Sequence, residues 1–336
     1  MSEIKIPEDY KPALGLKDTQ IAIKQVKDFF QGQLSAELNL HRVTAPLFVT
    51  PESGLNDNLN GVERPVAFGI KEQNERQAEI VHSLAKWKRM ALGRYGFKVG
   101  EGLYTDMNAI RRDEDTDNIH SIYVDQWDWE RVIRHEDRNE ATLVDTVKSV
   151  YEALRVTEKH MSNLYDYIEC FLPEEIYFVT SQELLDRWPD ATPKEREYNI
   201  VKEHGAVFVE KIGGALSNGE PHDGRAPDYD DWDLNGDIIV YYPVDDIALE
   251  LSSMGIRVDE VSLPKQLKEA GCEERLSLSF HRDIMEKKLP YTIGGGIGQS
   301  RICMFFLRKC HIGEVQVSLW PDEDVQYARE HGVTLL

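Results

Sequence analysis

The stretch Gly294-Gly295-Gly296-Ile297-Gly298-Gln299-Ser300-Arg301 is the strongest local signal in the chain. It follows a short strand-like run, Tyr291 to Ile293, and precedes an apolar run, Ile302 to Leu307, that predicts a helix. Glycines let a ligand approach the backbone closely, and the first N–H groups of a helix are unpaired donors that favour anions. The stretch therefore predicts either a nucleotide or anion site, to which Arg301 adds positive charge, or a loop that lets strand and helix pack closely.

Neither common phosphate-binding motif is present in this stretch. The dinucleotide pattern Gly-x-Gly-x-x-Gly, counted from Gly294, reaches Gln299 where its last glycine should stand. The phosphate-loop pattern lacks its Gly-Lys-Ser/Thr ending. A nucleotide site here would therefore belong to another fold class.

Composition predicts a globular protein that acts on small molecules. The chain has 336 residues, of which 41% are hydrophobic, enough for a substantial core. Its 39 Lys and Arg against 60 Asp and Glu give a net charge of -21, which opposes a broad surface for nucleic-acid phosphates. The cysteines form no CxxC pair and the histidines show no ligand spacing, so structural zinc and a disulfide framework are not expected.

Nothing in the sequence indicates a membrane segment or a signal peptide. No stretch approaches 18 uninterrupted apolar residues, and the N-terminus has no apolar core followed by a cleavage site. We therefore expect a cytoplasmic protein with no membrane partner. Without a repeat or a long linker, the sequence predicts an arm over residues 1–17 and a single catalytic domain over residues 18–336.

The N-terminal third predicts a helix, a strand and a second helix. Asp18 or Thr19 would cap a helix running to about Leu40, and alternating apolar residues from Arg42 to Thr50 predict a strand with an edge or bulge at Pro46. Leu55 to Gly61 is turn-rich and could simply satisfy local backbone groups. Glu79 to Arg94 predicts a helix whose basic side chains either form a solvated face or bind a substrate carboxylate.

A polar face marks the strand predicted from His120 to Glu130. Alternation places Val124, Gln126, Asp128 and Glu130 on one side and the two tryptophans on the other. Such a strand is either an exposed edge or the floor of a site. Arg111 and Arg112 end the preceding apolar run, and their adjacency leaves open which of them would contact a ligand.

The C-terminal half predicts a second polar face. In the strand from Ile247 to Arg257, alternation puts Glu250 and Ser252 together, and a bulge at Gly255 would bring Arg257 to the same face. Glu250 with Asp237, in the strand predicted to begin at that residue, offers oxygen ligands of the kind Mg²⁺–ATP sites use, although such a pair is also common in structural roles. Amphipathic helices are predicted over Thr142 to Ser162 and from Pro193 to Gly205.

Five stretches together resemble the ammonia-dependent asparagine synthetases, or aspartate–ammonia ligases. Besides the glycine stretch they are His82-Ser83-Leu84-Ala85-Lys86-Trp87-Lys88-Arg89, Val124-Asp125-Gln126-Trp127-Asp128-Trp129-Glu130, Arg225-Ala226-Pro227-Asp228-Tyr229-Asp230-Asp231-Trp232 and Glu250-Leu251-Ser252-Ser253-Met254-Gly255-Ile256-Arg257. The match runs in order to Trp320-Pro321, nearly the whole chain. It implies an α+β fold, a mainly antiparallel sheet flanked by helices as in class II aminoacyl-tRNA synthetases, and a homodimer formed through the first helix and strand.

The resemblance implies two chemical steps. The β-carboxylate of L-aspartate attacks the α-phosphate of ATP, with Mg²⁺ bound, and ammonia then attacks the β-aspartyl adenylate to give L-asparagine and AMP. It implies catalytic roles for Asp57, Arg111 and Gln126. Aspartate would be held by Ser83, Lys88, Gln126, Asp128, Ser253 and Arg257; ATP by Arg111, Asp230, Asp237, Glu250, Gly294, Gly295, Gly296, Gly298 and Arg301; and Mg²⁺ by Asp237 and Glu250.

Two other interpretations use the same residues. A class II tRNA-charging enzyme would share the adenylation site, but the net charge and the lack of residues for an anticodon-binding domain oppose it. A non-catalytic, synthetase-like regulatory protein would be expected to lack the motif arginines, whereas Arg111, Arg257 and Arg301 are present. No cysteine lies in a nucleophile motif, so free ammonia is the expected nitrogen source.

Overall fold

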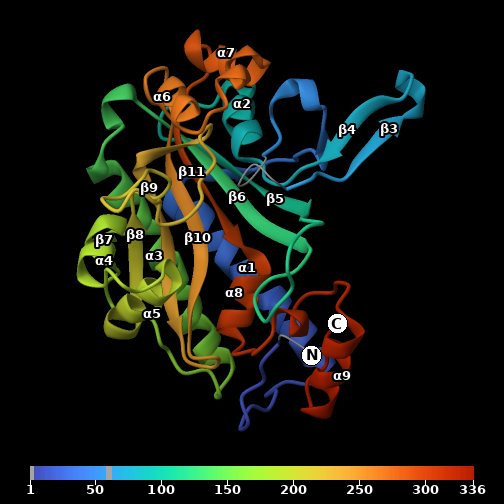
Figure 1. Ribbon diagram of the computed structural model, residues 1–336. Helices are drawn as coiled ribbons and strands as arrows, with labels where there is room; N and C mark the ends of the chain where they lie inside the picture. Colours follow the sequence, from blue (N-terminus) through green and yellow to red (C-terminus); the bar gives the residue numbers. More distant parts are fainter. Residues whose placement is uncertain (1–3, 58–62) are drawn as a thin grey trace.

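The main sheet carries the architecture of the computed structural model, which describes residues 4–57 and 63–336. Its strands are β1 (Leu40–Arg42), β5 (Gly102–Ile110), β6 (Tyr123–Ile133), β7 (Tyr177–Thr180), β8 (Ala206–Glu210), β9 (Asp230–Tyr242), β10 (Ile247–Arg257) and β11 (Tyr291–Gly298). They lie in the order β1-β5-β6-β11-β10-β9-β8-β7 (Figure 1). Only the outer pairs β1–β5 and β7–β8 of this sheet, within the described residues, are parallel. The expected α+β fold with a mainly antiparallel sheet is confirmed.

One face of this sheet is covered by α1 (Leu16–Leu38), α3 (Glu140–Leu164) and α8 (Gln299–Phe306), which lie behind the sheet in Figure 1. The buried positions of α1, among them Val26, Phe30 and Leu34, recur every three or four residues and so form one stripe along the helix. They pack in one core cluster with Trp127 and Trp129, the apolar side of β6. The polar side of β6 therefore faces the opposite way.

The remaining elements surround the other face and the ends of the sheet. They are α2 (Ala85–Tyr95), α4 (Ser181–Arg187), α5 (Pro193–His204), α6 (Ser262–Glu269), α7 (Ser279–Met285) and α9 (Asp322–Glu330). A small sheet of β2 (Phe48–Val49), β4 (Arg76–Ile80) and β3 (Ala67–Ile70), in that order, projects to one side (Figure 1). In the ranges that the structure describes, no helix is both long and apolar enough to span a membrane.

The N-terminal third differs from the prediction at three points. Helix α1 begins at Leu16 after Gly15, so neither Asp18 nor Thr19 is its cap, and Thr19 is buried. The single strand predicted from Arg42 to Thr50 is wrong, because β1 pairs with β5 and β2 pairs with β4 of the small sheet. The chain leaves one sheet for another around Pro46, which has no N–H to continue a ladder. The division into an arm and one catalytic domain stays a prediction.

The helix predicted over Glu79 to Arg94 is also wrong in its first turn. Glu79 and Ile80 belong to β4, where Ile80 pairs with Phe48 and Glu79 with Val49, and helix α2 starts only at Ala85. Cross-strand partners decide the conformation of such short segments, and they come from outside the predicted window.

The glycine stretch is a strand rather than a loop. Residues 291–298 form β11, which pairs with β6 on one side and β10 on the other, and α8 starts directly after Gly298. Consequently β6 lies inside the sheet and its interpretation as an exposed edge strand is wrong. Strand β9 likewise starts at Asp230, earlier than the predicted start at Asp237.

Candidate active site

A cleft of about 420 Å³ opens on the polar face of the sheet. Strands β6, β10 and β11 contribute its floor, and α2, the loop after β5 and the loop before β9 contribute walls. Most of the residues predicted from the sequence line it: Asp57, Ser83, Lys88, Arg111, Gln126, Asp128, Asp230, Glu250, Ser253, Arg257, Gly295, Gly296, Gly298 and Arg301. Asp237 and Gly294 do not line it.

The glycines of β11 make room for polar side chains on both neighbouring strands. Gly294 pairs with Glu130, and Gly296 with Asp128, across the β6–β11 ladder. A Cβ on Gly296 would lie 2.6 Å from Oε1 of Gln126 and 3.0 Å from Oδ1 of Asp128, and one on Gly294 would collide with the Glu130 carboxylate. The sequence run thus serves close packing within the sheet and keeps the floor of the cleft open.

Strand β10 changes face earlier than predicted. Its pairing with β9 is irregular between Glu250 and Ser252, so Ser253, not Ser252, shares the face of Glu250. The Ser253 hydroxyl donates a 3.0 Å hydrogen bond to Oε1 of Glu250, while Ser252 is buried. Alternation from Ser253 then brings Arg257 to the cleft, and the irregularity predicted at Gly255 is present as well.

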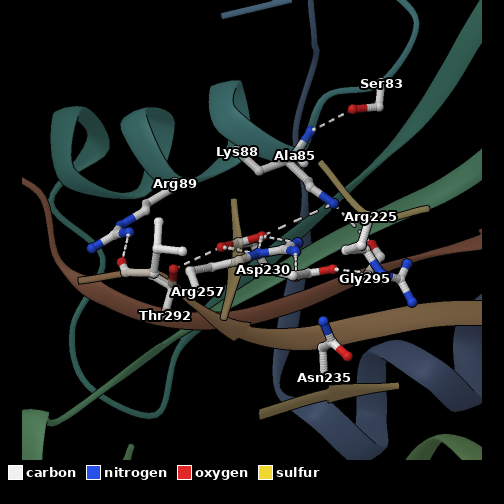
Figure 2. Close-up of polar contacts among 12 residues, drawn as sticks. Ser83, Ala85, Lys88, Arg89, Arg225, Asp230, Asn235, Arg257, Thr292 and Gly295 are labelled. Atoms are coloured by element: carbon white, nitrogen blue, oxygen red, sulfur yellow. Dashed lines mark hydrogen bonds and ion pairs between the residues drawn. The ribbon is translucent and has the colours of Figure 1, made fainter. Parts of the chain in front are cut away.

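A buried ionic network underlies one end of the cleft. Arg257 donates to Glu130 through Nε and Nη2, at 3.0 and 2.8 Å, and to Asp230 through Nη1. Lys88 Nζ, reaching from α2, donates to the Gly295 carbonyl at 2.8 Å (Figure 2). The same Nζ lies 3.3 Å from Oδ2 of Asp128. Each of these charges is paired, as burial requires.

Burial and ion pairing shift the pKa values of these groups in opposite directions. Burial alone would raise the pKa of Glu130, but the Arg257 guanidinium and Lys88 hold it below its usual range. Burial lowers the pKa of Lys88, against the attraction of Asp128. Lys88, Asp128 and Arg257 of this network line the cleft, so their charges are held in fixed positions beside any ligand there.

A second group of charges surrounds Glu250 at another part of the cleft. Arg301 Nη1 donates to the Glu250 carbonyl at 3.1 Å and lies 3.6 Å from its carboxylate. Arg225 Nη2 donates to Asp237 at 2.6 Å, and Asp237 is not among the residues that line the cleft. Burial raises the pKa of Asp237 despite Arg225, and Glu250 raises it further, so the two carboxylates are close. Glu250 and Asp237 together fit Mg²⁺, which protein sites hold through one or two carboxylates plus substrate phosphates.

The structure distinguishes the two adjacent arginines. Arg111 lines the cleft, with Nη1 3.8 Å from Glu114, whereas Arg112 is exposed and lies outside the lining. Asp57 also reaches the cleft from its loop: it is only 2% exposed, and Oδ2 accepts a 3.0 Å hydrogen bond from the Ser83 hydroxyl. The rest of the predicted turn-rich stretch, residues 58–61, lies outside the described residues.

Sequence reasoning missed several residues of the cleft. Arg225, Tyr229 and Lys194 line it without having been assigned a role, and Glu130 lies directly beneath it. Arg225 and Tyr229 belong to a stretch that carried the family resemblance, so that signal could have found them. Lys194 lies in the first turn of α5, and no sequence signal marks it.

Comparison with known proteins identifies the family. The model of the aspartate-ammonia ligase family matches residues 17–332. The chain belongs to the aspartate–ammonia ligase family. Among curated relatives, the aspartate–ammonia ligase of Clostridium perfringens strain SM101 is 63% identical over 100% of both chains. That of Clostridium tetani is 64% identical over 98% of this chain and 97% of the relative.

Solved structures place the fold of this ligase-family chain among class II synthetases. The asparaginyl-tRNA synthetase of Pyrococcus horikoshii, in complex with asparaginyl-adenylate, matches with a TM-score of 0.63 and 16% identity, over 96% of this chain and 77% of that one. The asparaginyl-tRNA synthetase of Entamoeba histolytica matches with a TM-score of 0.62 and 13% identity, over 90% of this chain and 67% of that one. At these identities the likeness concerns the fold.

Proposed function

We propose that the cleft joins L-aspartate and ammonia into L-asparagine at the expense of ATP, through a β-aspartyl adenylate, with AMP and pyrophosphate as the other products. One observation carries the proposal. The residues that the family resemblance assigns to aspartate and to ATP come from segments far apart in the sequence, yet they line one cleft. This is the arrangement that a two-substrate ligase requires, because the reacting groups must be held in contact.

The aspartate subsite lies over the buried network. Lys88 and Arg257 supply positive charge for a carboxylate of the substrate, and such charge-assisted contacts are strong in a closed site. Oδ1 of Asp128 is buried with no hydrogen-bond partner in the chain as described, which suits an acceptor for the substrate ammonium group. Gln126, Ser83 and Ser253 complete this subsite.

The first step is attack of a β-carboxylate oxygen on the α-phosphorus, with pyrophosphate leaving. We assign Arg111 to the β-carboxylate and the α-phosphate, and Arg301 with the glycines of β11 to the rest of the nucleotide; the support is that Arg111, Arg301 and three of these glycines line the same cleft. Bound Mg²⁺ neutralises phosphate charge, and Glu250 and Asp237 are the residues that would hold it. Asp230, paired with Arg257, lies toward the aspartate end, so we now assign it there rather than to ATP.

The second step is attack of ammonia on the β-carbonyl carbon, with AMP leaving. Asp57 is the residue we assign to ammonia, because its carboxylate reaches the cleft beside Ser83, a residue of the aspartate subsite. A carboxylate there can hold ammonium and accept the proton that the attacking nitrogen loses.

An assay of AMP release tests the proposed function. With aspartate, ammonium, ATP and Mg²⁺ present, AMP and asparagine should form in equal amounts, and omission of any one component should stop asparagine formation. Release of ADP in place of AMP would refute the adenylate chemistry. Charging of tRNA with aspartate or asparagine at moderate salt would instead support the tRNA-charging alternative. A homodimer and a cytoplasmic location are further parts of this proposal.

A further inference from the structure

Lys194 is a cation of the cleft that the reaction described above leaves without a role. It lies in the first turn of α5 and lines the cleft together with Glu250 and Arg225, which come from β10 and the loop before β9. Its side chain is 70% exposed, so the ammonium group is open to a ligand. Three cations, Lys194, Arg225 and Arg301, thus lie around Glu250, and each lowers the pKa of that carboxyl against the effect of burial.

The partners of Lys194 hold it at the rim of the cleft. Its Nζ lies 3.0 Å from Oε2 of Glu197 and 3.5 Å from Asp223. Glu197 is buried, and its other oxygen lies 3.1 Å from Nε2 of the buried His222. An ion pair with an exposed lysine contributes little to stability, so these contacts leave the ammonium group available to a more highly charged ligand.

The surrounding charges fit the far end of a triphosphate. Glu250 and Asp237 are the proposed Mg²⁺ ligands, and Mg²⁺ in such sites also binds the phosphates of the nucleotide. Lys194 is close enough to Glu250 for each charge to shift the pKa of the other. Glu197 and Asp223 add two more negative charges here, so the loss of a cation at this end would weaken binding of a polyanion.

We propose that Lys194 binds the β- and γ-phosphates of ATP and the pyrophosphate that leaves, and that Glu197, backed by His222, positions its side chain. This inference rests on the proposed function and deepens it. It makes Lys194 a residue that distinguishes ATP from AMP, because AMP lacks the two phosphates that would reach it. The lysine is a point charge on a flexible stem, suited to follow pyrophosphate as it leaves.

The test measures the affinities of three ligands for the wild type and for variants of Lys194. Affinities for ATP, pyrophosphate and AMP are measured by calorimetry with MgCl₂ present, for the wild type and for Lys194→Gln. We expect Kd to rise about tenfold for ATP and for pyrophosphate, as for loss of one charge-assisted contact, and to change less than twofold for AMP. Lys194→Arg should restore most of the loss. Lys202→Gln is the matched control, since Lys202 lies in the last turn of α5, pairs with Asp246 and does not line the cleft.

The outcomes separate the inference from the proposed function. Unchanged affinities for ATP and pyrophosphate in Lys194→Gln, with normal AMP release by the wild type, would overturn the role of Lys194 alone. A loss of AMP affinity equal to that for ATP, or a lowered melting temperature, would show a structural role and overturn it as well. A wild-type protein that binds no ATP would overturn both.

Discussion

At the scale of a single residue, substitution of Asp57 should separate the two steps of the proposed reaction. Asp57→Asn keeps the size of the side chain, and its oxygen can still accept from the Ser83 hydroxyl, but it removes the charge that would hold ammonium. We expect the variant to retain aspartate-dependent exchange of pyrophosphate into ATP and to lose most asparagine formation. Both activities are measured on one preparation. Equal losses in both would assign Asp57 to aspartate binding or to the fold.

Asp245, in the turn between β9 and β10, predicts a pH dependence of stability. Both carboxylate oxygens are buried without a hydrogen-bond partner in the described chain, and burial, with Glu314 as a second cause, raises the pKa of Asp245 to about 8. The folded state therefore holds this proton more tightly than the unfolded state, whose Asp pKa is about 3.9. The free energy of unfolding contributed by Asp245 falls as pH rises from about 4 to about 8.

Asp245→Asn removes this titration. We expect the variant to be more stable than the wild type, with a larger gain at pH 8 than at pH 5 in urea unfolding. Asp246→Asn is the control, because the neighbouring Asp246 is exposed and its pKa is lowered by Lys202. An equal gain at both pH values would contradict the assignment.

At the residue scale, the sequence predicted most of the cleft lining through motifs. The differences concern which side chains reach the cleft, because the fold alone decides that. Asp237 was expected to line the nucleotide side of the cleft, yet it pairs with Arg225 and is not among the lining residues. Its assignment to Mg²⁺ stays a proposal. Ser252 was expected beside Glu250, but the irregularity at Leu251 exchanges it for Ser253. Alternation along a strand cannot locate a bulge, because one extra residue leaves no mark in composition.

At the element scale, β11 makes a prediction about its own glycines. In Gly296→Ala the new methyl group would displace the side chains of Gln126 and Asp128, which line the cleft and so have room to shift. We expect the KM for aspartate to rise by about tenfold or more, with a small change in melting temperature. The measurement is steady-state kinetics with thermal unfolding.

Gly294→Ala is the matched comparison on the same strand. Its methyl group would meet the buried pair of Glu130 and Arg257, so it should lower the melting temperature strongly. Identical effects of the two substitutions on stability would contradict the distinction between Gly296, which keeps the cleft open, and Gly294, which makes room for the buried ion pair.

Strong periodicity made some elements predictable, whereas β1, β2 and β4 were not. Helix α3 and the polar face of β6 follow from strong periodicity over many residues. The glycine run was expected at the start of a helix, as an anion site or as a loop that lets strand and helix pack closely, but pairing on both sides holds it as a central strand. β1, β2 and β4 depend on partners distant in the sequence, which a local pattern does not contain.

At the scale of the whole molecule, we predict a homodimer whose interface includes part of residues 18–50. Ile21 on α1 is 48% exposed, and Leu47 and Phe48 are exposed as well, so apolar surface remains there after the helix has packed on the sheet. Sedimentation should give twice the 38.6 kDa mass of the chain. Ile21→Glu should weaken the dimer, whereas Val317→Glu, at a more exposed apolar site outside this range, should not. A fully active monomer at micromolar concentration would contradict the prediction.

Transfer of oxygen from aspartate tests the central claim most directly. Aspartate carrying ¹⁸O in both oxygens of its β-carboxylate is converted with unlabelled ATP and ammonium, and the products are analysed by mass spectrometry. If the β-carboxylate attacks the α-phosphorus, one labelled oxygen must remain in the phosphate of AMP and the other in the amide carbonyl of asparagine. Label in orthophosphate, with ADP formed in place of AMP, would contradict the account.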